Sequence, residues 1–252
     1  MSAEFLDALP LSLRTRVDQV AARVADALVR YPRTVFATSF GAEDMVLLDL
    51  LDAVGAEVEV FTLDTGRLPE ETHALMDEVR QRYRLRVRTF FPDAAQVERM
   101  VDEQGANGFR VSVDARKRCC QVRKLEPLAR ALQGKSMWIT GLRREQAVTR
   151  AGLDVLARDE GNGLMKLAPL ADWTAADVDA YVRARGVPVN SLHARGYPSI
   201  GCAPCTRAVT PGEDARAGRW WWEQPESKEC GLHLGPDGRL GRAKTIAVAV
   251  AP

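Results

Sequence analysis

Five cysteines are the residues of this sequence best suited to chemistry: Cys119, Cys120, Cys202, Cys205 and Cys230. The first two are adjacent, and the next two enclose an Ala-Pro dipeptide in a CxxC loop. Four thiolates from two such pairs can close a tetrahedral zinc site or ligate an iron–sulfur cluster. Adjacent cysteines cannot easily aim both sulfurs at one small ion, whereas a cluster presents separate corners. The spacing therefore favours a [4Fe–4S] cluster over zinc, with four buried free cysteines as the plain alternative.

The fifth cysteine lies apart from these pairs, in the sequence ECGLH that ends at His233. Cys230 has polar and glycine neighbours there, which suits a nucleophile better than a core residue. His233 is close enough in sequence to lower the pKa of the thiol or to act on a leaving group. An incidental surface cysteine is the alternative.

Basic residues surround the tandem pair in the segment RKRCCQVRK. If this segment is helical, Arg116 and Lys124 each lie one turn from Cys120 on the same face. Cations there would stabilise a cluster with four thiolate ligands, which carries net negative charge. The alternative is a solvated basic helix face that contributes little energy. We expect Pro127 to break or restart the helix just after this turn.

Two further segments have the composition of turns that hold a nucleotide. Residues 38–44, TSFGAED, supply a hydroxyl and a glycine, and residues 63–67, LDTGR, supply a carboxylate, a hydroxyl, a glycine and a cation. In parallel sheets, such strand-to-helix turns bind anions with the free N–H groups of the helix. Ordinary turns favour the same residue types, so that alternative stays open. The GxGxxG and GxxxxGK[ST] patterns are absent, which disfavours a dinucleotide enzyme or a P-loop NTPase.

These turns need a framework, and the hydrophobic pattern predicts one of alternating strands and helices. Short apolar and β-branched runs predict strands within residues 34–41, 57–66, 86–91, 136–141 and 164–170. Helical patterns cover residues 13–28, 42–54, 69–83, 94–104 and 174–186, the last with Thr174 as its N-cap. The alternation predicts an α/β fold in which helices cover both faces of a parallel sheet.

Length and composition limit the class of protein. The chain has 252 residues, of which 46% are hydrophobic and 27% charged, and its formal net charge is +1. We predict an α/β core over residues 1–186 and an irregular C-terminal segment over 187–252, forming one domain overall. The sequence has no pattern of a membrane span or signal peptide, so we expect a cytoplasmic protein that binds neither nucleic acid nor membranes. An odd number of cysteines in such a chain indicates metal, cluster or thiol chemistry rather than disulfides.

Seven motifs between residues 38 and 233 form an ordered set: SFGAED, LDTGR, KRCC…K, ITGLRREQ, GCAPCTR, EDARAGRWWW and ECGLH. Each is weak alone, but the set is highly specific. It resembles the assimilatory sulfonucleotide reductases, in particular the bacterial thioredoxin-dependent adenylyl-sulfate (APS) reductases. The fold of that family is a Rossmann-like α/β domain of the adenine nucleotide α-hydrolase type, which agrees with the alternation above.

The resemblance implies a role for each motif. The four paired cysteines would ligate a [4Fe–4S] cluster, and Cys230 would be the nucleophile. The residues expected to bind substrate through adenosine and ribose, or beside the nucleophile, are Ser39, Gly41, Glu43, Asp64, Thr65, Gly66 and His233. The cations expected to hold the phosphosulfate are Lys124, Arg143 or Arg144, Arg216 and Arg219, with Arg150 as an alternative in GLRREQ and its continuation. Arg216 and Arg219 would share one helix face if their segment is helical.

The implied reaction is the reduction of APS to sulfite and AMP in sulfate assimilation, toward cysteine biosynthesis. Cys230 would attack the sulfur of APS, expel AMP and become an S-sulfocysteine, from which thioredoxin would release sulfite. The cluster needs no redox change in this scheme and would position and polarise the site. We expect the C-terminal tail to close over the substrate and then to meet thioredoxin. The oligomeric state, including a homo-oligomer, is left open.

Three alternatives to this function remain. The first is a reductase of the same mechanism that acts on the 3′-phosphorylated nucleotide PAPS in place of APS, although the cluster cysteines usually accompany APS in this family. An ATP-pyrophosphatase would need an SGGxDS-type loop, and SFGAED lacks its second glycine and its serine. A zinc-stabilised, non-catalytic nucleotide-binding module is the alternative from another class.

Three consecutive tryptophans, Trp220 to Trp222, cannot all face one core on a helix, so we expect one to meet a ligand, a neighbouring chain or the tail. His73 and His193 have no ligand-like neighbours in the sequence and are interpreted as structural or surface residues.

Overall fold

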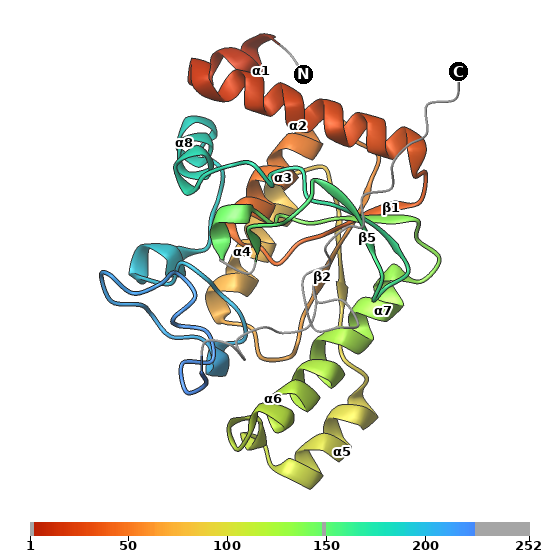
Figure 1. The fold of residues 1–252 in the computed structure, drawn as a ribbon, viewed down its shortest axis with the longest axis vertical. Helices are drawn as coiled ribbons and strands as arrows, with labels where there is room; N and C mark the ends of the chain where they lie inside the picture. Colours follow the sequence, from red (N-terminus) through yellow and green to blue (C-terminus); the bar gives the residue numbers. More distant parts are fainter. Residues whose placement is uncertain (1–2, 148–149, 225–252) are drawn as a thin grey trace.

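A six-stranded sheet, in the order β3-β2-β1-β4-β6-β5, forms the centre of the molecule (Figure 1). The structure is a computed structural model and describes residues 3–147 and 150–224. The strands are β1 (Thr34–Ala37), β2 (Glu59–Leu63), β3 (Val87–Phe90), β4 (Met137–Ile139), β5 (Leu156–Asp159) and β6 (Leu164–Leu167). The α-helices are α1 (Ala3–Asp7), α2 (Leu11–Arg30), α3 (Ala42–Ala53), α4 (Glu70–Arg82), α5 (Ala94–Gln104), α6 (Val113–Cys120), α7 (Glu126–Leu132) and α8 (Ala175–Arg185).

The sheet is parallel except at one edge. β1 pairs in parallel with β2 and β4, and β4 pairs in parallel with β6. This confirms the predicted α/β fold with strands at all five expected positions. β5 was not predicted: it pairs antiparallel with β6 through a tight turn, in which Gly163 has a φ of 71° and donates its N–H to the carbonyl of Asp159. No residue pattern in the sequence indicated this antiparallel edge strand, because a short hairpin strand has no crossover helix to mark it.

Helices cover both faces of the sheet, as predicted. On one face, buried side chains of α2, α3, α4 and α8 join those of β1, β2, β4 and β6 in the larger core. On the other face, Leu128, Ala131 and Leu132 of α7 pack against Val35 and Trp138 of the central strands. The strands β1, β2 and β4 thus alternate between two apolar environments, which fixes their register because a one-residue slip would exchange the two faces.

The tandem cysteines lie in a helix that changes its pitch. α6 ends at Cys120, a π-helical turn, η2, covers Gln121–Leu125, and α7 continues the path with Pro127 near its first turn. The segment around the tandem cysteines is thus helical, and Pro127 lies in the first turn of α7 without interrupting the helical path. The π turn was not predicted; such turns are rare and occur frequently at functional sites.

The chain beyond α8 is irregular as far as the structure describes it. Within residues 187–224 the regular elements are the short 3₁₀ turns η5 (Ser191–Arg195) and η6 (Ala203–Cys205) and one isolated bridge between Thr206 and Arg219. Arg216 and Arg219 therefore do not share a helix face. The helix α8 begins at the predicted cap, where Thr174 and Asp177 bond reciprocally to each other's backbone N–H groups. None of the described helices has the length and apolar character needed to cross a membrane.

Candidate active site

The two predicted turns meet at the carboxyl end of the central strands. β1 leads to the turn that contains Ser39, and β2 leads to the turn that contains Asp64. The backbone N–H of Thr38 bonds to the carbonyl of Phe61 at 2.8 Å, which continues the pairing with β2 one residue beyond the end of β1. Parallel neighbours therefore bring both turns to one edge of the sheet, where ligands of such folds bind.

The turn after β1 is fixed by Asp44, a residue of its motif to which we assigned no role. Asp44 accepts hydrogen bonds from the backbone N and the Oγ of Ser39, at 2.6 and 2.7 Å, and from the backbone N of Gly141, at 3.1 Å. Burial, the largest influence, raises the pKa of Asp44 to about 6 although the bonds from Ser39 and Gly141 lower it. Gly41 has open space beside it, since a Cβ there would approach only Ser39 Oγ and Glu43 Oε2, at 3.5 and 3.8 Å.

The turn after β2 connects a carboxylate to a thiol. Asp64 is buried and accepts hydrogen bonds from the backbone N of Gly66, at 2.8 Å, while its other oxygen contacts Nε2 of His73 at 2.9 Å. The Oγ1 of Thr65 lies 3.2 Å from the Sγ of Cys202. Gly66 has a φ of 69°, so the turn needs a glycine. His73, interpreted from the sequence as a structural or surface residue, thus contacts a predicted site residue. His193 instead bonds to the carbonyl of Tyr197.

The four paired cysteines line one pocket of about 360 Å³, part of which is open to solvent. The tandem pair reaches the pocket from the end of α6, and the CxxC pair reaches it from η6. All four are free thiols. The residues that line this thiol pocket are Arg67, Phe109, Arg116, Cys119, Cys120, Arg123, Lys124, Cys202, Cys205, Arg219 and Trp220.

Backbone contacts tie the CxxC loop to the turn after β2. The N–H of Ala203 donates to the carbonyl of Arg67 at 2.8 Å, and Nη1 of Arg123 donates to the carbonyl of Thr65 at 2.7 Å. The loop itself closes through the N–H of Cys205, which bonds to the carbonyl of Cys202. The thiol pocket and the turn after β2 are therefore one continuous structure.

The surroundings of the pocket shift the pKa values of three of these thiols, one downward and two upward. Burial alone would raise the pKa of Cys202, but Lys124, the hydrogen bond with Thr65 and nearby arginines outweigh it and lower the pKa. Burial and the neighbouring thiols raise the pKa of Cys205 to about 12, and burial also raises the pKa of Cys119. Close thiolates repel one another, so this donor set can ionise fully only around a compensating positive centre.

Two arginines form the wall of the thiol pocket with Trp220. The Arg116 and Arg219 guanidinium groups lie 4.6 and 4.8 Å from the ring centroid of Trp220, which is 1% exposed. Arg116 forms a buried bidentate ion pair with Glu223, with N–O distances of 2.9 and 2.8 Å. Gly201 leaves room for Arg219, because a Cβ at that position would lie 2.3 Å from Nη2 of the guanidinium. The expectation that one tryptophan meets a ligand site agrees with Trp220; Trp222 packs on Phe109, and Trp221 is half-exposed.

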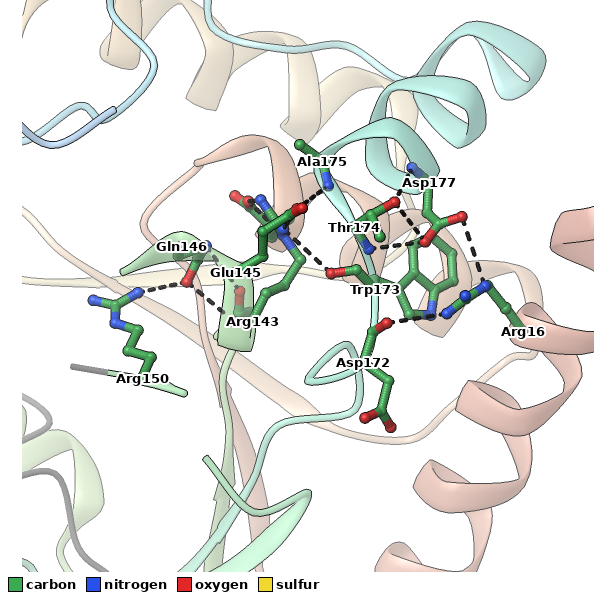
Figure 2. Close-up of polar contacts among 12 residues, drawn as sticks. Arg16, Arg143, Glu145, Gln146, Arg150, Asp172, Trp173, Thr174, Ala175 and Asp177 are labelled. Atoms are coloured by element: carbon green, nitrogen blue, oxygen red, sulfur yellow. Dashed lines mark hydrogen bonds and ion pairs between the residues drawn. The ribbon is translucent and has the colours of Figure 1, made fainter. Parts of the chain in front are cut away.

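The two arginines of GLRREQ are not among the residues that line the thiol pocket, and Figure 2 shows Arg143 beside Glu145 and Trp173. Arg143 donates from Nε and Nη2 to Oε1 of Glu43, at 2.9 and 2.7 Å, and from Nη1 to Glu145 and to the carbonyl of Trp173. Arg144 donates to the carbonyl of Leu153 and is ion-paired with Asp172, which lies in the segment before α8.

The structure gives each cation predicted to hold the phosphosulfate different surroundings. Because Arg143 and Arg144 are ion-paired with carboxylates, their role as phosphosulfate ligands stays a prediction that the geometry does not favour. The alternative Arg150 is buried and bonds to Oε1 of Gln146. Lys124 and Arg219 line the thiol pocket, whereas Arg216 is half-buried and is not among the residues that line it. Cys230 and His233 lie outside the described residues.

The described side chains do not form a site for a single metal ion. Within residues 3–147 and 150–224, no group of three or more His, Cys, Asp or Glu side chains is arranged to hold one ion. Whether the site holds zinc or a cluster is therefore argued from its donor groups. These are four thiols that line one pocket, together with five cationic side chains at its wall.

Comparisons with known proteins agree on one family. Residues 33–208 match the model of the phosphoadenosine phosphosulfate reductase domain. An adenosine 5′-phosphosulfate reductase of Burkholderia cepacia is 51% identical over 93% of this chain and 94% of its own length. One from Allochromatium vinosum is 57% identical over 79% and 78%. The crystal structure of a phosphoadenylyl-sulfate reductase from Candida auris, a phosphate complex, superposes with a TM-score of 0.66 at 26% identity and covers 83% of this chain and 98% of that one.

Proposed function

This chain belongs to the phosphoadenosine phosphosulfate reductase family, and from that premise we propose that it reduces adenylyl sulfate (APS) to sulfite and AMP in sulfate assimilation. It is thus an oxidoreductase that acts on a sulfur group, as its adenosine 5′-phosphosulfate reductase relatives are named. The observation that carries the proposal is the thiol pocket, in which four cysteines and five cations meet directly beside the turn after β2. We propose that the enzyme works in the cytoplasm, where thiols are kept reduced.

We propose that the thiol pocket holds a [4Fe–4S] cluster ligated by Cys119, Cys120, Cys202 and Cys205. Thiolates are the ligands of such clusters, and positive irons would offset the burial and the repulsion between thiols that raise the pKa of Cys205. Donors that surround a pocket without converging on one ion position also suit a cluster better than zinc. When bound, the cluster would position and polarise the anion site.

The substrate is proposed to lie across the two turns and to extend toward the thiol pocket. Ser39, Gly41 and the turn after β2 would contact adenosine and ribose. Lys124 and Arg219 are the cations whose positions best support contact with the phosphosulfate, because both reach the pocket wall that adjoins this turn. Their charge would stabilise AMP as a leaving group.

The reaction is proposed to proceed through two displacements at sulfur. The thiolate of Cys230 attacks the sulfur of APS, the S–O bond to the phosphate breaks, and AMP leaves, so that Cys230 becomes an S-sulfocysteine. A thiolate of thioredoxin then attacks the Cys230 sulfur and expels sulfite. The second thioredoxin thiol resolves the mixed disulfide, which returns the Cys230 thiol and leaves thioredoxin oxidised.

Sulfite release tests this function. Purified protein with reduced thioredoxin should release sulfite from APS faster than from PAPS, and Cys230→Ala should reduce the rate to background while still binding APS. Mass spectrometry of the wild type with APS and no thioredoxin should show one added SO₃ group, which is absent from Cys230→Ala. Equal sulfite release by the wild type and Cys230→Ala would show that Cys230 is not the nucleophile. Faster turnover of PAPS than of APS would show that PAPS is the substrate.

A separate experiment tests the cofactor and distinguishes the cluster enzyme from the zinc-stabilised, non-catalytic module. Anaerobically purified protein should be brown, with a broad absorption near about 400 nm and iron and sulfide in equal amounts, because iron–thiolate charge transfer absorbs visible light. Substitution of Cys205 by Ser should abolish the colour. Colourless wild-type protein with one zinc per chain would contradict the cluster.

A further inference from the structure

One buried carboxylate joins the ends of two neighbouring strands, and the proposed reaction assigns it no role. Asp44 lies in the first turn of α3 and is 7% exposed. It holds both donors of Ser39, which follows β1, and the backbone N–H of Gly141, which follows β4. A single side chain therefore sets the distance between the two loops at the proposed nucleotide site.

The close packing around Asp44 requires a glycine at position 141 and accompanies a strained residue, Phe40, in the turn after β1. A Cβ at Gly141 would lie 2.2 Å from Oδ1 of Asp44 and 3.1 Å from its backbone N, so only glycine allows the approach. Phe40 is 2% exposed and has a φ of 59°, a left-handed conformation that costs an L residue roughly 1 kcal/mol or more. The strained turn keeps its shape only while its neighbours hold it, and Asp44 holds the residue that precedes Phe40.

We propose that Asp44 is a positioning residue, whose carboxylate holds Ser39 and Gly141 in the geometry that the adenosine part of the substrate requires. The inference rests on the proposed function, because Ser39 and Gly41 are the residues expected to contact adenosine. Asp44 acts through them and has no contact with the reacting atoms.

The charge state of Asp44 makes this role measurable. An ionised carboxylate can accept all three hydrogen bonds, whereas a protonated one keeps an O–H that must donate. Burial and, to a smaller extent, Glu43 on the same helix raise the pKa of this carboxyl to about 6, against the lowering effect of the bonds from Ser39 and Gly141. Glu43 is itself ion-paired with Arg143, from the loop after β4. APS should therefore bind about tenfold more weakly near pH 5 than near pH 7.5, by proton linkage.

The experiment measures APS affinity against pH in protein that cannot turn over. The parent is Cys230→Ala without thioredoxin, and APS is used because it has no group that titrates in this range, unlike AMP. The parent should lose about tenfold in affinity between pH 7.5 and pH 5. Asp44→Asn in the parent should bind at least about tenfold more weakly at pH 7.5, because an amide offers one acceptor and turns an NH₂ toward Ser39 or Gly141. Its affinity should not change with pH.

Asp49→Asn is the matched control. Asp49 is buried on the same helix but accepts hydrogen bonds from Tyr83, Tyr181 and Arg185, on the side of the larger core. This variant should lower stability and keep the parent's affinity and pH profile.

A second measurement does not depend on a variant that folds. The Asp44 carboxyl carbon, followed by ¹³C NMR in the parent, should titrate at lower pH with APS bound than without it, because binding favours the ionised form. An unchanged midpoint, or equal APS affinity in the parent and Asp44→Asn, would overturn the positioning role alone. A parent that binds no APS at any pH would overturn the proposed function and this inference together.

Discussion

The arginine side chains near this site differ in the groups that they contact. Arg143 is buried against Glu43, and Arg144 pairs with Asp172, so each guanidinium satisfies a carboxylate of its own chain. Arg219 is also buried; it donates to the Ser199 hydroxyl and the Ile200 carbonyl and lies against the Trp220 ring. Because Arg219 lines the thiol pocket, its guanidinium is placed to bind an anionic substrate there.

Gly201 gives this cation its place, and Gly201→Ala should displace it. The added Cβ would lie 2.3 Å from Nη2 of Arg219, and the guanidinium is confined by Trp220 and the Ile200 carbonyl. We expect kcat/KM for APS to fall at least about tenfold, a loss of about 1.4 kcal/mol in transition-state binding, with little change in melting temperature. Steady-state kinetics with thioredoxin and a thermal melt measure both.

Gly152→Ala is the matched control for that substitution. Gly152 has nothing within 4 Å of its Cβ position, so the variant should keep wild-type kinetics. Wild-type kcat/KM in Gly201→Ala would mean that Arg219 does not contact the substrate. A large fall in melting temperature would mean instead that the glycine serves the loop's stability.

Two elements of unrelated sequence carry the thiols, and their local structure decides how these converge. The π turn after α6 rotates the helix beyond Cys120 relative to an ideal α-helix, and Lys124 within this turn still reaches the thiol pocket. The CxxC loop is held in place by its bond to Arg67 and by the Thr206 hydroxyl, which donates to the carbonyl of Cys202.

The last described turn, at Glu223, is joined to the element that carries the tandem cysteines. Arg116 and Glu223 are 1% and 4% exposed as side chains and bond in a bidentate manner. Removing one partner of such a pair leaves a buried charge, which is costly. The contact fixes the point from which the chain continues toward Cys230.

Stability and substrate affinity should respond to pH in opposite directions. Asp44 has a folded pKa of about 6 against an ordinary value of 3.8, so the folded state binds its proton more tightly than the unfolded state. Its contribution to stability is full below pH 3.8 and is lost as pH rises through about 6. Lowering the pH from 7.5 to 5 should therefore add about 1 kcal/mol to the free energy of unfolding from this group alone.

Urea unfolding of wild type and Asp44→Asn across this pH range isolates the contribution. The free energy of unfolding of the wild type, minus that of the variant, should increase as the pH falls. A difference that is constant with pH would mean that Asp44 stays ionised throughout. The other carboxylates titrate in both proteins and cancel.

The sequence by itself determined the α/β fold, because apolar spacing and strand length depend on local order that a pattern records. It also singled out the four paired cysteines and the turns at Ser39 and Asp64, since each motif is contiguous in the chain. The role of Cys230, which lies outside the described residues, stays a prediction that rests on the sequence.

Only the tertiary structure decided which side chains are available and which are already paired. The ion pair of Arg143 with Glu43 spans 100 residues, and the bond of Gly141 to Asp44 spans 97. Neither leaves a trace in local spacing. The antiparallel β5, the contact of His73 with Asp64 and the π turn at Lys124 were also missed, because these local features have no distinct residue pattern.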